Sequence, residues 1–359
     1  MSVKPATKTL WLLILAAFLI GAGLAGIGFA FGGFLPNGIQ YDGLRFYNWR
    51  TGEELDARLN VIEYQKPGTF DGEIYEVDAF DNLRVTTANT SIDIVRGESD
   101  RFAYALIVDE PETFEVKSEG GTLSIEQEPI HFGMRGTRLM MDALNGFPQG
   151  GVVRVYVPES WQFNELALES ASGDIVVGGE GMVSNSPLMG KELKINSVSG
   201  ATQLRDSIRC ADATIESVSG GIEIFSLYTS GDITIEMVSG WLSAAELGEQ
   251  GNPANAVNLH VISGTITVEN ISAREINVNT VSGDVDLSVA DLASYSKQVE
   301  SVSGNVNFDG MRMKGGASFD AGGGAKEISV TTISGNVRIN TAEVGPDEAP
   351  ELLETPELP

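Results

Sequence analysis

A four-residue motif ending in Ser-Gly returns through the second half of the chain and limits the possible folds more than any other feature. Its form is Ser-Val-Ser-Gly, with Thr, Met or Val at the first position and Ile at the second in some copies. The copies are residues 197–200, 217–220, 237–240, 261–264, 280–283, 301–304 and 332–335, after a weaker copy at 170–173. Self-similarity at a period of roughly 20–30 residues is typical of stacked units, none of which buries its apolar face alone.

Short alternating runs flank each copy and predict strands on both sides of it. Residues 193–196 precede one copy and residues 222–224 follow another, both with β-branched and polar side chains in alternation, which is typical of half-buried strands. The Ser-Gly step between the runs indicates a corner, because glycine adopts positive φ and serine hydrogen-bonds the neighbouring backbone. We expect apolar residues four or five positions before the Ser-Gly corner to point inward: Ile195, Ile215, Ile235, Val278 and Val330.

The predicted fold is therefore all-β, a β-solenoid in which each strand pairs with its equivalent one rung away. A β-sandwich of similar strands is the alternative. Residues 74–128 and 152–157 alternate in the same way without the motif, and we expect them to form the opening rungs, since terminal repeats are often atypical.

The N-terminus predicts a membrane anchor. Residues 10–35 form an uncharged apolar run preceded by Lys4 and Lys8, which is long enough to span a bilayer with the N-terminus in the cytoplasm. The predicted organisation is a cytoplasmic N-terminus at 1–9, a transmembrane helix at 10–35 and a juxtamembrane segment at 36–73. The β-solenoid follows at 74–342, and a disordered acidic tail rich in Pro and Glu ends the chain at 343–359.

The net charge of the chain restricts its partners, and its cysteine content restricts its disulfide bonding. The formal net charge is −27, with 50 acidic and 23 basic residues, which argues against a nucleic-acid partner. The single cysteine, Cys210, permits no intramolecular disulfide, and we expect it to be buried as a small apolar residue.

The same motifs carry a resemblance to a known family. The apolar anchor, the strands around 91–94, 121–125 and 155–158, and the serial Ser-Gly-Asp and Ser-Gly-Asn corners resemble the bacterial DUF4097 family, which is also labelled adhesin. The resemblance covers roughly residues 76–340 and implies a β-strand-repeat fold at the cell envelope. It implies no catalytic residue set, and similarity of some members to envelope stress-response components implies a signalling alternative.

Residue chemistry predicts no catalytic or cofactor site. A Ser–His pair needs a histidine, and the chain has only His131 and His260, far apart in sequence. Asp174, Asp232 and Asp284 each follow a Ser-Gly step, and stacked carboxylates of this kind are potential Ca²⁺ ligands. Asp also suits turns, and we expect a turn role without metal.

The resulting prediction is a non-catalytic, membrane-anchored extracytoplasmic β-solenoid that serves as a structural, adhesive or interaction module. Its partners are the membrane and an envelope protein or a glycan. The first alternative is a membrane-tethered component of envelope-stress signalling. The second is a carbohydrate-active solenoid enzyme that uses clustered carboxylates.

Overall fold

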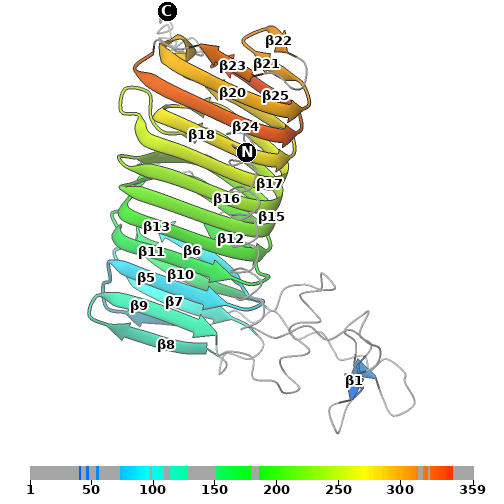
Figure 1. The fold of residues 1–359 in the computed structure, drawn as a ribbon. Helices are drawn as coiled ribbons and strands as arrows, with labels where there is room; N and C mark the ends of the chain where they lie inside the picture. Colours follow the sequence, from blue (N-terminus) through cyan, green and yellow to red (C-terminus); the bar gives the residue numbers. More distant parts are fainter. Residues whose placement is uncertain are drawn as a thin grey trace, which may run out of the picture.

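The strands of the protein stack into a rod of rungs (Figure 1). A computed structural model describes residues 73–97, 99–108, 114–127, 151–178, 186–313 and 324–342, together with the backbone of a few short strands outside these ranges. Three of these, β1 (Gln40–Tyr41), β2 (Phe46–Tyr47) and β3 (Glu54–Leu55), form a small antiparallel sheet of their own. All the other strands belong to one 22-stranded sheet.

Three long strands in the middle of the rod show what a rung is. β15 (Asp212–Thr229), β16 (Asp232–Leu247) and β17 (Ala254–Ile271) each run through a corner glycine without a break. They pair in parallel and in register, so that Gly220 lies opposite Gly240, and Gly240 lies opposite Gly264. The repeated motif therefore stacks on itself, as the predicted solenoid requires.

Elsewhere a rung is divided into one strand before the corner and one after it. The strands before the corner are, in order along the rod, β9 (Thr122–Gln127), β5 (Asn82–Thr87), β11 (Gln162–Ser170), β13 (Leu188–Ser199), then β15 to β17, β18 (Ala273–Ser282), β24 (Lys326–Ser334) and β20 (Tyr295–Ser303). Those after it are β10 (Val152–Pro158), β6 (Ser91–Gly97), β12 (Ile175–Val177), β14 (Thr202–Cys210), then β15 to β17, β19 (Val285–Val289), β25 (Val337–Thr341) and β21 (Val306–Phe308).

Antiparallel strands close both ends of the rod. β8 (Phe114–Glu119) pairs with β9, β7 (Phe102–Ile107) pairs with β10, and β4 (Ile74–Val77) pairs with β7. At the other end, β22 (Met311–Met313) pairs with β21 and β23 (Ser318–Ala321) pairs with β20, while the short 3-10 helix η2 (Leu292–Ser294) precedes β20. Such caps limit the open strand edges through which stacked sheets associate.

Residues 74–128 and 152–157 form the opening rungs, as predicted, but the order of rungs along the rod differs from their order in the sequence. The first rung of the chain, β5–β6, lies between the β9/β10 rung and the β11–β12 rung. The last rung, β24–β25, likewise lies between β18–β19 and β20–β21. Both terminal rungs are thereby hydrogen-bonded on two sides, and hairpin strands fill the exposed ends.

The core follows the predicted alternation. Ile195, Ile215, Ile235, Val278 and Val330, the residues predicted to point inward, are all 0% exposed. Together with the inward residues after the corners, they form one apolar cluster that runs through the described strands. Burial of these stacked aliphatic columns is the main favourable contribution to the stability of the rod.

Glycine is required at the corners because the rungs approach one another closely there. Gly240 has a φ of +133°, and a Cβ placed on it would lie 1.9 Å from the carbonyl oxygen of Gly220. The same contacts show that the rungs are not stacked in sequence order. A Cβ on Gly335 would lie 1.9 Å from the carbonyl oxygen of Gly283, and a Cβ on Gly304 would lie 1.9 Å from the carbonyl oxygen of Gly335.

The predicted transmembrane helix at 10–35 and the predicted disordered tail at 343–359 lie outside the described residues. Within the part of the chain that the structure describes, no helix has the length and apolar character needed to cross a membrane.

Candidate functional site

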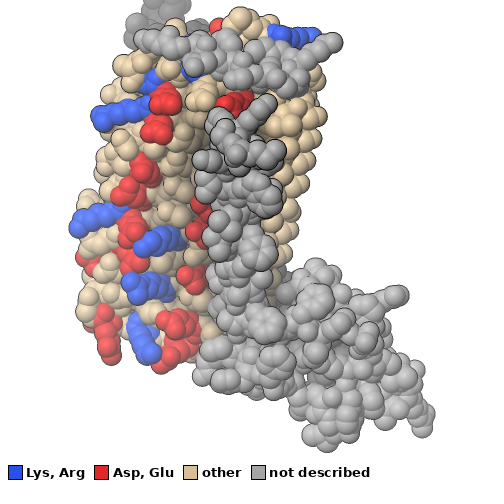
Figure 2. All heavy atoms as spheres, in the orientation of Figure 1, with Lys and Arg blue, Asp and Glu red and all other residues tan. Residues whose placement is uncertain are grey.

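The outer surface of the strands before the corners, here called the broad face, carries columns of polar side chains. Because the strands are in register, Glu169, Asn196, Glu216, Glu236 and His260 are successive members of one column. Figure 2 shows acidic and basic side chains in a band that follows the length of the rod. Such a surface suits contact with an extended partner, since no single rung stands out from its neighbours.

Carboxylates within this column influence one another. Partial burial raises the pKa of Glu216, and the nearby charges of Glu236 and Glu169 raise it further. The Nδ1 atom of His260 lies 3.7 Å from a carboxylate oxygen of Glu236. Glu216 and Glu236 are therefore like charges on adjacent strands, and Asn196 separates Glu169 from Glu216.

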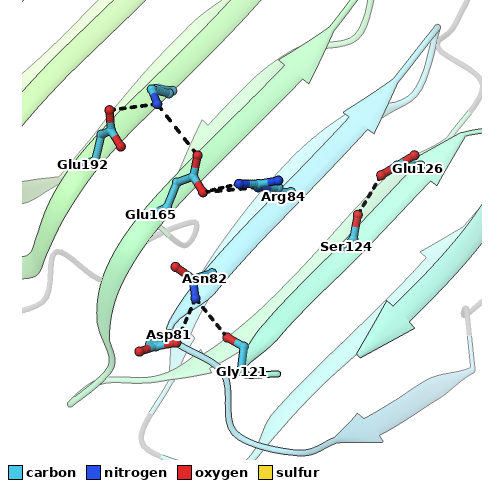
Figure 3. A network of polar contacts seen from close by, with 9 residues as sticks. Asp81, Asn82, Arg84, Gly121, Ser124, Glu126, Glu165 and Glu192 are labelled. Carbon is cyan, nitrogen blue, oxygen red and sulfur yellow. Dashed lines mark hydrogen bonds and ion pairs between the residues drawn. The ribbon is translucent and has the colours of Figure 1, made fainter. Parts of the chain in front are cut away.

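Near the N-terminal end of the rod, ion pairs link neighbouring rungs on the broad face (Figure 3). Arg84 of β5 contacts the Glu165 carboxylate of β11 at 2.6 Å. Lys194 of β13 lies 2.7 Å from Glu192 and 3.8 Å from the other oxygen of Glu165. The side chains are partly exposed, so each pair contributes at most about 1 kcal/mol to stability.

The three aspartates predicted as a possible Ca²⁺ ladder do not lie in one column. Asp174 and Asp284 both follow corner glycines, but the rungs between them carry Ala201, Gly221, Trp241 and Thr265 at that position. Asp174 accepts a hydrogen bond from the backbone N–H of Ala201 at 2.8 Å. Asp284 accepts two from Asn336, one from its backbone and one from its side chain, both at 2.9 Å.

Asp232 stands at the opposite edge, where β16 begins and pairs with the start of β17. Its carboxylate accepts a hydrogen bond from the Asn255 side chain at 2.8 Å, and its backbone N–H donates to Asp212 at 3.0 Å. The sequence could not separate the two edges, because Ser-Gly-Asp occurs at both. Among the described residues, no group of three or more His, Cys, Asp or Glu side chains is placed to hold a metal ion. A turn role without Ca²⁺ stays a prediction.

Two of the remaining reactive residues, Cys210 and His260, lie in the part of the chain that the structure describes. Cys210 is buried, and burial together with the charge of Asp212 raises the pKa of its thiol to about 12, so the thiolate that would react is scarce. His260 is on the outer surface, as its alternation predicts. His131 lies outside the described residues.

Two polar clusters were not foreseen from the sequence. In the first, the Tyr228 hydroxyl donates to the Glu246 carboxylate, and Arg209 binds Glu249 through two hydrogen bonds of 2.8 and 2.9 Å. The Arg209 guanidinium lies 5.1 Å from the centre of the Tyr228 ring. Burial and then the hydrogen bond to Glu246 raise the pKa of Tyr228, which keeps the hydroxyl protonated as a donor.

The second cluster is a buried ion pair between Arg96 and Asp206, whose side chains are each 3% exposed and lie 3.3 Å apart. Arg96 also donates to the backbone oxygens of Ser186 at 3.0 Å and Glu159 at 2.7 Å. It thereby ties the first rung of the chain to two loops and to β14. The sequence signal that could have revealed this ion pair is Asp206, an aspartate at an inward-facing position of the alternating strand β14.

Comparison with solved structures finds similar proteins with low sequence identity. One is a protein provisionally described as lipid-binding from Parabacteroides distasonis, with 16% identity, a TM-score of 0.41, and coverage of 76% of this chain and 98% of that one. Another is a protein provisionally described as an adhesin from Bacteroides fragilis, with 13% identity, a TM-score of 0.34, and coverage of 74% and 95%.

A search of curated proteins found no significant match. The family comparison is decisive, since residues 80–340 match the model of the Toastrack DUF4097 family. The chain therefore belongs to the Toastrack DUF4097 family.

Proposed function

We propose that the protein is a non-catalytic, membrane-anchored module that presents its rod outside the cytoplasm as a binding surface for an envelope component. The observation that carries this proposal is the regularity of the outer columns on a continuous core. Polar side chains recur at equivalent positions of the broad face from rung to rung. The clustered polar groups off that face, such as Arg96 with Asp206 and Tyr228 with Glu246, bind one another. Such an arrangement suits recognition by an extended surface more than chemistry at one point.

The location is testable with a single engineered thiol. Ser263 is exposed at a corner and Cys210 is buried. We expect Ser263→Cys in a Cys210→Ala background to react with a membrane-impermeant maleimide in intact cells or spheroplasts. The unmodified protein serves as the control for folding, because its buried Cys210 should stay unlabelled. A Ser2→Cys variant in the same background serves as the control for cell integrity.

Labelling of Ser263→Cys only after lysis would contradict the extracytoplasmic location. The non-catalytic part of the proposal needs a separate assay, in which the purified full-length protein is incubated with envelope polysaccharides and the release of reducing ends is measured. We expect no release above a heat-denatured control, whereas turnover that tracks the protein would favour the carbohydrate-active alternative.

A further inference from the structure

The outer surface of the strands after the corners, here called the narrow face, carries an exposed tryptophan in an unusual setting. Trp241 follows the corner Gly240 and lies opposite Gly221 of the neighbouring rung. A Cβ placed on Gly221 would lie 2.3 Å from both Cε2 and Cζ2 of the indole, so the ring covers the outward side of this glycine. Gly221 is buried, whereas Trp241 remains 46% exposed.

A second exposed aromatic lies on the same face. Phe225 is also 46% exposed, and it stands four residues beyond Gly221 with the same outward alternation. The two aromatics are therefore roughly 13 Å apart along the strand and one strand spacing, about 4.8 Å, apart across it. The other exposed large apolar residues among the described residues, such as Tyr75, Val302 and Met311, lie elsewhere on the rod. Trp241 and Phe225 therefore form the one pair of exposed aromatics on adjacent rungs of the narrow face in the described part of the chain, and exposed apolar surface rimmed by polar residues marks interaction sites.

Polar side chains occupy the space between the two rings. The outward residues of this middle column are Gln203, Glu223, Ser243 and Thr267, which lie side by side on successive rungs. Hydroxyl, amide and carboxylate groups between two aromatic platforms form a surface that is apolar at its two ends and hydrogen-bonding at its centre. This combination matches a ligand with apolar ring faces and hydroxyl edges.

The charge of this surface restricts the ligand further. Glu223 and Glu269 are exposed on the narrow face. The nearby cation, Arg205, donates to the Gln203 side-chain oxygen at 2.8 Å. With a net charge of −27 on the chain as well, an anionic polymer would be repelled. The charge therefore disfavours an anionic ligand, and the aromatic and hydrogen-bonding groups of this surface match the ring faces and hydroxyl groups of a neutral sugar.

We propose that Trp241 and Phe225 form a binding platform for a neutral oligosaccharide, with sugar rings stacked on the two aromatics and hydroxyl groups bonded to the polar column between them. This inference rests on the proposed role as an envelope-binding module and names the ligand class for it. Gly221 is a positioning residue, because any side chain there would displace the indole from the sheet.

The test uses the full-length protein in a detergent without a sugar headgroup. Binding of two neutral probes, the β-1,4-linked hexasaccharides of glucose and of N-acetylglucosamine, is measured by calorimetry, with polygalacturonate as the anionic comparison. The replacements are chosen from equivalent positions on neighbouring rungs, because the fold already accepts those residues there. Thr265 lies opposite Trp241, and Ala245 lies opposite Phe225. The variants are Trp241→Thr and Phe225→Ala, and the matched control is Val302→Thr, at a residue that is 65% exposed in another part of the rod.

We expect at least one neutral hexasaccharide to bind saturably and polygalacturonate not to bind. Trp241→Thr should weaken binding by about tenfold or more, which corresponds to about 1.4 kcal/mol, with unchanged melting temperature, and Val302→Thr should have no effect. Absence of binding to both neutral probes, or binding that Trp241→Thr leaves unchanged, would overturn the inference. If Ser263→Cys is labelled in intact cells but neither probe binds, the inference fails and the proposed location stands.

Discussion

The close approach of the corner glycines predicts a large and position-specific cost for adding one methyl group. In Gly240→Ala, the new Cβ would lie 1.9 Å from the Gly220 oxygen, so the two rungs would have to separate by more than 1 Å at that point. The positive φ of +133° costs roughly 1–2 kcal/mol for a residue with a side chain. Displacement of the packed rungs adds about 1–3 kcal/mol, as overpacking does in a core.

The expected loss in the free energy of unfolding is therefore about 2–5 kcal/mol, measured by guanidinium denaturation of the full-length protein. Gly251→Ala is the matched control, because Gly251 also has a positive φ, of +97°, but nothing lies within 4 Å of its added Cβ. It should lose only the conformational part, roughly 1–2 kcal/mol. Equal losses for the two variants would refute the argument that contact between rungs, rather than φ alone, demands glycine.

Three further predictions concern buried polar groups. Arg96→Met removes the ion-pair partner of Asp206, which is 2% exposed, and should cost about 3–5 kcal/mol of unfolding free energy. The double variant Arg96→Met with Asp206→Leu should cost less, and a double variant at least as unstable as the single one would contradict this. Thr280 has a buried hydroxyl without a hydrogen-bond partner among the described residues, and it lies next to Val261 on the neighbouring rung. Thr280→Val should therefore raise the unfolding free energy by about 1 kcal/mol. A lower unfolding free energy in the same denaturation assay would indicate a bound water. The thiol pKa of Cys210 rises from 9.0 to about 12 on folding, so between these pH values the folded thiol keeps its proton while the unfolded one ionises. The unfolding free energy should therefore fall with rising pH by up to about 1.4 kcal/mol per pH unit in this range. The same slope in Cys210→Ala would exclude the thiol as its cause.

Much of the rung could be predicted from the sequence because its determinants are local. The inward position of Ile215 follows from alternation, and the need for glycine at residue 220 follows from a motif that recurs at every corner. The burial of Cys210 also follows from its place in an alternating strand. These features repeat in each rung, so each copy of the motif supports the interpretation of the others.

The order of the rungs could not be predicted, because the corners are locally equivalent. Ser334 pairs with both Ser282 and Ser303, and nothing in the motif favours this order over a sequential one. The setting of Trp241 was missed for a related reason, since it depends on a glycine twenty residues earlier that becomes its neighbour only in the stack. Arg96 and Asp206, which are 110 residues apart in the sequence, likewise meet only because the first rung is placed inside the rod.

Disulfide trapping between corner serines tests the permuted stack most directly. In a Cys210→Ala background, Ser282→Cys with Ser334→Cys and Ser303→Cys with Ser334→Cys place thiols on adjacent strands, about 4.8 Å apart and within disulfide range. Ser282→Cys with Ser303→Cys places them two strands apart, at roughly 10 Å, which is out of range. We predict rapid oxidation of the first two pairs and none of the third under mild oxidant. Efficient cross-linking of the 282–303 pair, with none of the 282–334 pair, would contradict the permuted stack and restore sequential order.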